Sequence, residues 1–348
     1  MENGITVALL THGGGAHVAA YLAALRDSPD CQQVVLADPD GRWETEARRV
    51  LGRKLTRVSK DHGKLLSTTQ PSLALVTMEA RLAPAVIEIA LDANCHIFAE
   101  KPACVRPDDF ARLVAKADSK HRHLMLALAN RTNPETIQAR RIFRRGDIGR
   151  LFGIEMHIIA DQTRLTRPAY HQQWFADKHR AGGGHLIWLG IHWLDLAMHI
   201  TGTQVRQACG FTQNVGGQPI NVEDSAVAAL RFDNGALGTV TSGYYVDKGY
   251  HTHIKVWGSH GWLHLDSMHE RPLQWSSSQG AHAGQLQEFK GSKEPRGYTP
   301  FVRAAIQACA RGTDPPISNA ESLRALQTVF AIYKSSDTGR VQIIAGAA

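Results

Sequence analysis

Residues 5–25 read ITVALLTHGGGAHVAAYLAAL, and this stretch decides the fold of the first part of the chain. An apolar, β-branched run leads into a glycine-rich turn and then into a segment of helical composition. Four more strand-like runs follow, separated by helix-like segments, at residues 31–38, 73–78, 96–101 and 124–131. Such alternation predicts a parallel sheet with helices on both faces, which binds ligands at the carboxyl ends of its strands.

The pattern changes after residue 150. Residues 151–160 predict a strand and residues 182–200 predict a helix. Short alternating runs then follow, separated by turn signals such as Asn234-Gly235, which are typical of hairpins in an antiparallel sheet. Residues 299–312 and 318–336 predict two further helices, so the second part is expected to be α+β, with helices on one face of a sheet.

Composition limits the class of protein. The chain has 348 residues, of which 43% are hydrophobic and 20% charged, and its formal net charge is +7. This length suggests two domains. Basic residues recur in pairs, as at Arg48-Arg49 and Arg140-Arg141, with no aromatic residues interleaved. We therefore interpret them as solvated helix faces rather than as a nucleic-acid surface.

The five cysteines lie far apart and form no C-x-x-C pair. This spacing disfavours a disulfide framework and a structural zinc site, and it suits a reducing compartment. No signal peptide is visible before the first strand, and no apolar run reaches the length of a membrane span. We expect a cytoplasmic protein that binds neither nucleic acid nor a membrane.

The first turn resembles a dinucleotide fingerprint. That fingerprint reads G-x-G-x-x-G/A between a strand and a helix, and here the frame is Thr11, Gly13 and Ala16. We expect Gly13 to let the backbone approach a pyrophosphate and Ala16 to let the helix pack closely. Thr11 replaces the first glycine, while Gly14 and Gly15 add backbone freedom. A glycine-rich turn without a ligand is the alternative.

Asp38 strengthens the dinucleotide interpretation. It ends the second predicted strand about 20 residues after the turn, where a carboxylate accepts hydrogen bonds from the ribose of NAD. Its charge would repel the 2′-phosphate of NADP, although Arg42 would partly offset this, so NAD is favoured. The alternative role of Asp38 is a turn former before Pro39. The residues that we expect to contact the cofactor are Gly13, Gly14, Gly15, Ala16, Asp38, Thr77, Glu100, Lys101 and Asn130.

Three segments together resemble one family. They are HIFAEKPACVRPDDFARLVAKA from residue 96, RIFRRGDIGRLFGIE from residue 141 and GGGHLIWLGIHWLDLAMHITG from residue 182. In this order they resemble the Gfo/Idh/MocA oxidoreductases, the family of glucose–fructose oxidoreductase and inositol dehydrogenase. The resemblance implies a Rossmann NAD(P)-binding domain over residues 1–130 and an α+β domain with an open, mainly antiparallel sheet over residues 131–348.

The resemblance also implies an activity and an assembly. The activity is hydride transfer between NAD(P) and a sugar, polyol or glycoside, and the back of the second sheet would form a homodimer or homotetramer. Glu100 and Lys101 match the Glu-Lys-Pro motif, with Lys101 between nicotinamide and substrate. His192 matches the catalytic histidine and Asp195 the aspartate three residues beyond it. Asn130 matches the first residue of a polar pair that ends the last strand of the first domain.

Besides Thr11 in the fingerprint, one major and one milder departure from the family pattern stand out. The family often has an aspartate four residues before its histidine, where this chain has Trp188. Tryptophan does not exchange a proton with substrate, so that role is absent or is filled by another group. The third predicted strand also ends in Met78-Glu79, where the family tends to have proline and then asparagine.

Oxidising an alcohol by hydride transfer requires a group that removes the hydroxyl proton. His192 titrates near neutrality with little tuning, and the positive charge of NAD⁺ favours a neutral lysine at position 101. We therefore expect His192 to carry the proton and Lys101 to act as base or carbonyl polariser, while Asp195 orients or caps. The alternatives are a surface lysine and a core histidine bonded to backbone.

On an ideal helix, His185, Trp188, His192, Asp195 and His199 fall within an arc of about 80°. His185 is a candidate to contact substrate or to replace the missing aspartate, and the alternative is a helix-start residue facing solvent. His199 is expected to pack. Histidines seven residues apart rise by about 10.5 Å, too far to share one ion easily, so no metal is expected.

Aromatic and polar residues precede this helix. They suit a sugar, which has apolar faces and polar edges, although the loop is equally explained as a cover for the sheet. The expected substrate contacts are Tyr170, His171, Trp174, His185, Trp188 and Asp195. Three functions stay open, namely an NAD(P)-dependent sugar or polyol dehydrogenase, a redox-neutral glycoside-processing enzyme with tightly bound NAD, and a non-catalytic nucleotide sensor.

Overall fold

The computed structural model describes residues 4–163 and 165–345. The chain forms two compact units. The first comprises the chain up to Thr132 together with His179–Gly182 and Pro295–Leu323. The second comprises Asn133–Lys178, Gly183–Glu294 and the chain from Arg324 onward.

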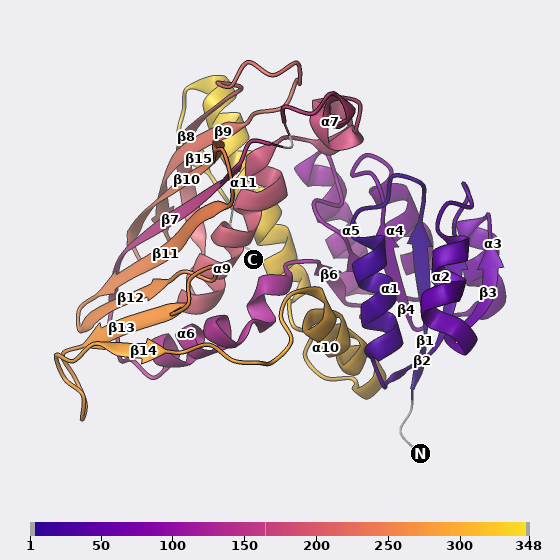
Figure 1. The fold of residues 1–348 in the computed structure, drawn as a ribbon, viewed down its shortest axis with the longest axis horizontal. Helices are drawn as coiled ribbons and strands as arrows, with labels where there is room; N and C mark the ends of the chain where they lie inside the picture. Colours follow the sequence, from indigo (N-terminus) through magenta and orange to yellow (C-terminus); the bar gives the residue numbers. More distant parts are fainter. Residues whose placement is uncertain (1–3, 164, 346–348) are drawn as a thin grey trace. The chain divides into compact units, whose positions relative to one another are not determined.

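The first unit is built on a six-stranded parallel sheet in the order β3-β2-β1-β4-β5-β6 (Figure 1). Its strands are β1 (Ile5–Thr11), β2 (Cys31–Ala37), β3 (Leu55–Ser59), β4 (Leu73–Thr77), β5 (His96–Ala99) and β6 (Leu124–Leu126). Its helices are α1 (Val18–Asp27), α2 (Glu44–Leu51), α3 (His62–Thr69), α4 (Ala83–Asp92), α5 (Pro107–Ser119) and α10 (Tyr298–Arg311). Helix α1 packs against α2 and α10, whereas α4 packs against α3 and α5. The predicted parallel α/β fold is confirmed.

The sequence predicted five strands here, and this number is wrong because β3 and the α3 helix after it were missed. The pattern of β3 is weak, since it lies at the edge of the sheet and Thr56 and Arg57 are exposed. The central strands are easier to recognise. Residues 7–10 of β1 and 73–76 of β4 are almost fully buried, as expected for parallel strands covered on both faces.

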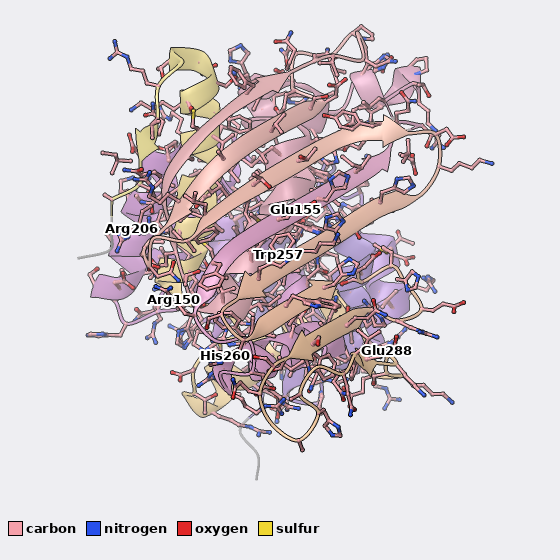
Figure 2. The ribbon with its side chains drawn as sticks, turned by 90° about the vertical axis from the view of Figure 1, so that its left-hand side faces the viewer. Arg150, Glu155, Arg206, Trp257, His260 and Glu288 are labelled. Atoms are coloured by element: carbon pink, nitrogen blue, oxygen red, sulfur yellow. The ribbon has the colours of Figure 1, made fainter. Side chains whose placement is uncertain are left out.

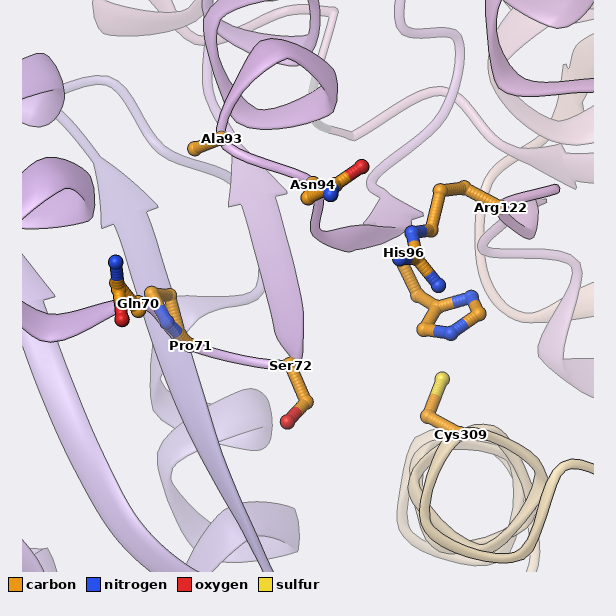
Figure 3. A pocket seen from close by; sticks show the side chains of 8 residues that line it. All are labelled: Gln70, Pro71, Ser72, Ala93, Asn94, His96, Arg122 and Cys309. Atoms are coloured by element: carbon orange, nitrogen blue, oxygen red, sulfur yellow. The ribbon is translucent and has the colours of Figure 1, made fainter. Parts of the chain in front are cut away.

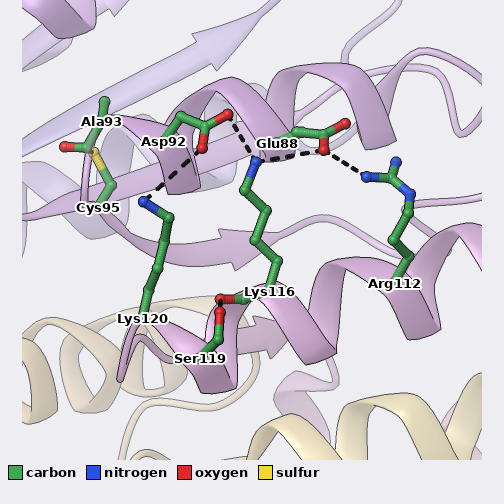
Figure 4. Close-up of polar contacts among 8 residues, drawn as sticks. All are labelled: Glu88, Asp92, Ala93, Cys95, Arg112, Lys116, Ser119 and Lys120. Atoms are coloured by element: carbon green, nitrogen blue, oxygen red, sulfur yellow. Dashed lines mark hydrogen bonds and ion pairs between the residues drawn. The ribbon is translucent and has the colours of Figure 1, made fainter.

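Ion pairs link the exposed sides of α4 and α5 (Figure 4). Glu88 pairs with Arg112 at 2.5 Å, and Lys116 joins Glu88 at 3.4 Å to Asp92 at 2.7 Å. On α2, Arg48 and Arg49 are paired with glutamates of the same helix. The prediction of solvated basic helix faces is therefore confirmed for Arg48 and Arg49, which are exposed, whereas Arg140 is part-buried against His199.

The second unit contains a nine-stranded sheet in the order β14-β13-β12-β11-β7-β10-β9-β8-β15. Strand β7 (Leu151–Asp161) runs parallel to β10 (Leu237–Val246) and antiparallel to β11 (Tyr250–Gly258). The other strands are β8 (Val205–Gln213), β9 (Ser225–Phe232), β12 (Gly261–Leu265), β13 (Leu273–Ser277), β14 (Gln287–Phe289) and β15 (Gln342–Ile343). The predicted second, mainly antiparallel sheet is confirmed, including the Asn234-Gly235 turn between β9 and β10.

Helices cover one face of this sheet. They include α6 (Pro134–Arg144), α9 (Ile191–Thr201) and the later part of α11 (Asn319–Thr338), and α9 packs on β7. The opposite face is open, and Figure 2 looks onto it, with Glu155 and Trp257 among the labelled side chains. None of the helices within the described residues has the length and apolarity needed to cross a membrane.

Candidate active site

In the turn after β1, the backbone at Gly15 lies very close to the ends of β1 and β4. Register between β1 and β4 places Thr11 beside Thr77 at the carboxyl edge of the sheet, and both are fully buried. A Cβ atom on Gly15 would lie 2.2 Å from Thr11 Oγ1 and 2.9 Å from the carbonyl oxygen of Thr77. The hydroxyl of Thr77 donates to the carbonyl of Ala16 at 2.5 Å. Gly15, next to Ala16, is thus a position where the strand ends leave no room for a side chain.

We expect Gly15→Ala to lower the free energy of unfolding by about 1–3 kcal/mol, because buried backbone and a buried hydroxyl must move. Gly13→Ala is the matched control, since its Cβ would meet the end of the flexible Asp40 side chain at 3.1 Å. Urea unfolding without added nucleotide measures both changes. Equal losses in the two variants would contradict the close approach at Gly15.

The carboxylate of Asp38 follows β2 and is 1% exposed. Its Oδ2 accepts a hydrogen bond from the backbone N–H of Trp43 at 2.6 Å. Its Oδ1 is buried and has no hydrogen-bond partner in the described chain. A buried acceptor without a partner is costly. One oxygen therefore shapes the turn, as the alternative interpretation requires, while the other fits the hydroxyl of a ribose.

Glu100 and Lys101 follow β5 directly, and each is 2% exposed. Lys101 Nζ lies 3.9 Å from Glu100 Oε1. The Tyr21 hydroxyl donates to the Glu100 carboxylate, and His17 Nδ1 lies 3.2 Å from it. Burial, together with the Glu100 charge, raises the pKa of Tyr21 well above its ordinary value. The alternative of a surface lysine at position 101 is wrong, because its side chain is buried beside a carboxylate.

Two more charged side chains of the first unit, those of Glu79 and Arg131, are buried and form ion pairs. Glu79, which follows β4, pairs with Arg180 through two contacts at 2.9 and 2.6 Å. Asn130 is half-buried in a short helical turn after β6, and the adjacent Arg131 pairs with Glu321 at 2.9 Å. Arg180 gave no signal in the sequence, because its partner lies far away along the chain.

Gly182, Gly183 and Gly184 were predicted to begin the helix but lie outside it, and each has a structural reason to be glycine. Gly182 has a positive φ of 83°. A Cβ on Gly183 would lie 2.2 Å from the Tyr333 hydroxyl, and one on Gly184 would lie 1.9 Å from the Glu223 carbonyl oxygen. Gly183 and Gly184 thus let the backbone approach the Tyr333 side chain and the Glu223 backbone, both in the second unit.

Glu223 and Tyr333 hold the start of the helix, and sequence analysis missed both. The Glu223 carboxylate accepts the N–H groups of Gly184 at 2.6 Å and Leu186 at 3.0 Å. The Tyr333 hydroxyl donates to the same carboxylate at 2.8 Å. Burial raises the pKa of Glu223. Neither residue belongs to a recognisable motif, so only the fold brings them here.

The predicted helix over 182–200 is in fact two segments. Leu186–Gly190 is a π-helix, and α9 begins at Ile191. A π-turn has wider spacing than an α-turn, so the arc expected for an ideal helix is wrong for the residues before α9. A Cβ on Gly190 would lie 2.8 Å from both Leu186 Cδ1 and Ser242 Oγ, which shows how closely the π-segment packs on the sheet.

The structure separates the three histidines. His185 is fully buried, its Nδ1 lies 2.6 Å from Ser242 Oγ, and its ring meets the Tyr244 ring edge-on at 4.3 Å. The alternative that His185 faces solvent is therefore wrong. His192 is half-buried in the first turn of α9, and Asp195 is buried one turn later. His199 packs as predicted, because Arg140 contacts its ring and donates to its carbonyl at 3.0 Å.

Trp188 belongs to an aromatic cluster. Its ring lies 5.6 Å from Trp174 and 5.6 Å from Phe175, and Tyr170 lies 4.8 Å from Phe175. Trp174 is 3% exposed, whereas Tyr170 and Trp188 are half-buried. His171 Nε2 lies 2.5 Å from the carbonyl oxygen of Leu165. Tyr170, Trp174 and Phe175 of the loop thus form one aromatic cluster with the tryptophan at the position of the family aspartate.

The described residues contain no ligand set of the kind that holds a metal ion. Across residues 4–163 and 165–345, no three His, Cys, Asp or Glu side chains are gathered as ligands around one position. Two features at the carboxyl edge of the parallel sheet fit a bound nucleotide instead. They are the backbone at Gly15, which has no room for a side chain, and the buried Oδ1 of Asp38.

Comparison with known proteins agrees with this geometry. The family model described as "Oxidoreductase family, NAD-binding Rossmann fold" matches residues 9–128, and that of the GFO/IDH/MocA C-terminal domain matches residues 136–264. Myo-inositol 2-dehydrogenase of Thermotoga maritima is 23% identical over 298 residues, which cover 85% of this chain and 86% of the relative.

Solved structures share the fold over nearly the whole chain. An oxidoreductase domain protein from Kribbella flavida has a TM-score of 0.86 at 22% identity, covering 99% of this chain and 100% of that one. A levoglucosan dehydrogenase in complex with NADH and levoglucosan has a TM-score of 0.84 at 18% identity, covering 98% and 100%. The chain therefore belongs to the Gfo/Idh/MocA family of oxidoreductases, and its first unit carries the NAD-binding Rossmann fold of that family.

Proposed function

We propose that the protein transfers a hydride between NAD and a hydroxyl or carbonyl group of a sugar, polyol or glycoside. The observation that carries this proposal is the buried Lys101, which follows β5 at the same sheet edge as the Gly15 turn and Asp38. The names of the relatives support the substrate class, since they act on myo-inositol and levoglucosan. In this proposal residues 1–130 bind the cofactor, and residues 131–348 bind the substrate.

The cofactor, when bound, supplies a nicotinamide ring that accepts or returns a hydride. In this proposal Lys101 is an ammonium rather than the neutral lysine that NAD⁺ alone would favour, since it lies beside the buried Glu100 carboxylate. The ammonium holds the reacting oxygen of the substrate, and Glu100 fixes its position. A ring nitrogen of His192 takes the hydroxyl proton during oxidation and returns it during reduction. Trp188 adds an apolar surface for the sugar, with Tyr170, His171, Trp174, His185 and Asp195 as further contacts or supports.

Asp38 sets the cofactor preference in this proposal. We expect Asp38→Asn to weaken NAD⁺ binding about tenfold, because a neutral amide replaces a charged acceptor. The preference for NAD⁺ over NADP⁺ should fall as well, since the carboxylate no longer repels a 2′-phosphate. Titrations of both nucleotides measure these changes, with the exposed Asp27→Asn as control. Unchanged NAD⁺ affinity in Asp38→Asn would remove the residue from the site.

A turnover screen tests the proposed reaction. The purified protein is first analysed for co-purified NAD(H) and is then incubated with NAD⁺ and a panel of sugars, polyols and glycosides. Accumulation of NADH supports the dehydrogenase. Product without net NADH, dependent on bound cofactor, would indicate the redox-neutral alternative. Absence of nucleotide binding would contradict the proposal, and binding without turnover would favour the sensor.

The open face of the nine-stranded sheet is the surface that we propose for a second copy of the chain. It exposes Phe211, Val227 and Leu237 on three adjacent strands, with exposed fractions of 73%, 49% and 59%. Phe211 and Val227 are register partners, whereas Leu237 lies opposite Arg231, farther along β9. Exposed apolar side chains on one sheet face favour an interaction surface, and a twofold axis would match this face with itself.

We expect Phe211→Lys to reduce the mass of the assembly to that of a smaller species, because the charge would be buried between copies. Light scattering after size-exclusion chromatography measures this. Leu82→Lys is the control, since Leu82 is an exposed apolar residue of the first unit. A monomeric wild-type protein would contradict the proposed interface.

We also propose a reducing, cytoplasmic location. The five cysteines are free, and burial raises the pKa of Cys31 to about 11 and that of Cys95 to about 12. Neutral buried thiols of this kind behave as small apolar residues.

A further inference from the structure

A pocket of about 460 Å³ opens at the amino-terminal edge of the six-stranded sheet (Figure 3). Ser72 precedes β4, His96 begins β5, and Arg122 precedes β6. Cys309 of α10 also lines the pocket. Because all six strands are parallel, this edge lies opposite the one that carries Asp38 and Lys101. The pocket is therefore separate from the proposed nucleotide site.

Arg122 gives the pocket a positive charge. Its side chain lines the pocket, its Nε is buried, and that atom has no hydrogen-bond partner in the described chain. The lining residues include no aspartate or glutamate. A buried guanidinium nitrogen without an acceptor is unfavourable. A ligand with an oxyanion would supply the missing acceptor through the planar fork that arginine offers to carboxylates.

The other lining residues are neutral, and several of them have side chains that can donate hydrogen bonds. His96 Nδ1 accepts the backbone N–H of His123 at 3.0 Å, which leaves the ring proton on Nε2. Burial lowers the pKa of His96 to about 4 and raises that of Cys309 to about 12, so both are uncharged at neutral pH. The Ser72 hydroxyl and the Asn94 amide add further hydrogen-bonding groups to the same lining.

Two helix ends limit the charge of the ligand. Helix α3 ends at Thr69 and α4 ends at Asp92, and the C-cap residues that follow them, Gln70 and Ala93, line the pocket. The carboxyl end of a helix carries a partial negative charge. These two ends oppose a second negative charge, so a monocarboxylate suits the pocket better than a phosphate dianion.

We propose that this pocket binds a small polyhydroxy monocarboxylate, with its carboxylate on Arg122 and its hydroxyl groups on His96, Ser72 and Asn94. The volume matches that of small-molecule sites, which start at about 300 Å³. This inference does not rest on the proposed oxidoreductase function.

The test uses D-gluconate as the probe and D-sorbitol as its uncharged analogue, with the full chain saturated with NAD⁺. We expect isothermal titration to give a Kd for gluconate of about 1 mM or tighter and no binding of sorbitol. Arg122→Gln should weaken gluconate binding at least about tenfold, because a charged hydrogen bond is lost. The control Arg53→Gln, an exposed arginine of the same unit, should bind gluconate like the wild type.

Hydrogen–deuterium exchange of the wild-type protein locates the probe even if Arg122→Gln does not fold. Gluconate should protect residues 70–72, 93–96 and 122–123. The proposal is overturned if gluconate does not bind, if Arg122→Gln binds it normally, or if protection falls at residues 12–16 or 100–102 instead. Tighter binding of inorganic phosphate than of gluconate would overturn the assignment to a monocarboxylate.

Discussion

His192→Ala is expected to lower kcat/KM by a factor of about 10²–10⁴, the usual contribution of a general acid or base. The substitution removes the only titratable group that we assign to proton transfer with the substrate hydroxyl. Trp188 lies in the π-segment before α9 and has no exchangeable carboxyl proton, so it does not replace the imidazole. Steady-state kinetics with the substrate found in the screen measure the effect.

The controls separate chemistry from folding. His199→Gln alters a histidine of the same helix that packs on Arg140, and its kcat/KM should stay within a few fold of the wild type. NAD⁺ affinity should be unchanged in His192→Ala, because the proposed cofactor contacts lie in residues 1–130. A wild-type rate would remove His192 from the site.

Lys101→Met is the second substitution with a large expected effect. Methionine keeps an unbranched apolar stem but loses the ammonium, so we expect kcat to fall by a factor of about 10²–10⁴. The folded state should also lose about 3 kcal/mol, because Glu100 stays buried without its cation. Kinetics and urea unfolding measure the two losses separately.

The double variant Lys101→Met with Glu100→Gln distinguishes the two roles. Removing both charges should restore most of the lost stability, since no carboxylate then stays buried without the lysine ammonium. Activity should not return, because the group that contacts the reacting oxygen is still absent. Recovery of activity in the double variant would show that Lys101 acts only by neutralising Glu100.

Local patterns predicted most of the fold. Buried central strands such as β1 and β4 have continuous apolar runs, and the turn between β9 and β10 has an Asn-Gly pair. Strand β3 was missed because an edge strand buries too few side chains to give a clear pattern. The π-segment was missed because it packs closely on Ser242 through Gly190, a neighbour that is distant in the sequence and leaves no local pattern.

The candidate site was predicted only as far as its motifs extend. Lys101, His192 and Asp38 follow strand ends or match a family motif. The residues that support them do not, because Tyr21 reaches Glu100 and Tyr333 reaches Glu223 only through the tertiary fold. Gly15 illustrates the same limit, since its close neighbours Thr11 and Thr77 belong to two adjacent strands.

The path of the substrate hydrogen tests the proposed reaction most directly. The substrate found in the screen is prepared with deuterium on the carbon that is oxidised, and a single turnover with NAD⁺ is analysed by mass spectrometry. We predict that the deuterium appears in NADH. Deuterium that exchanges into water while the nucleotide stays unlabelled would contradict hydride transfer to NAD.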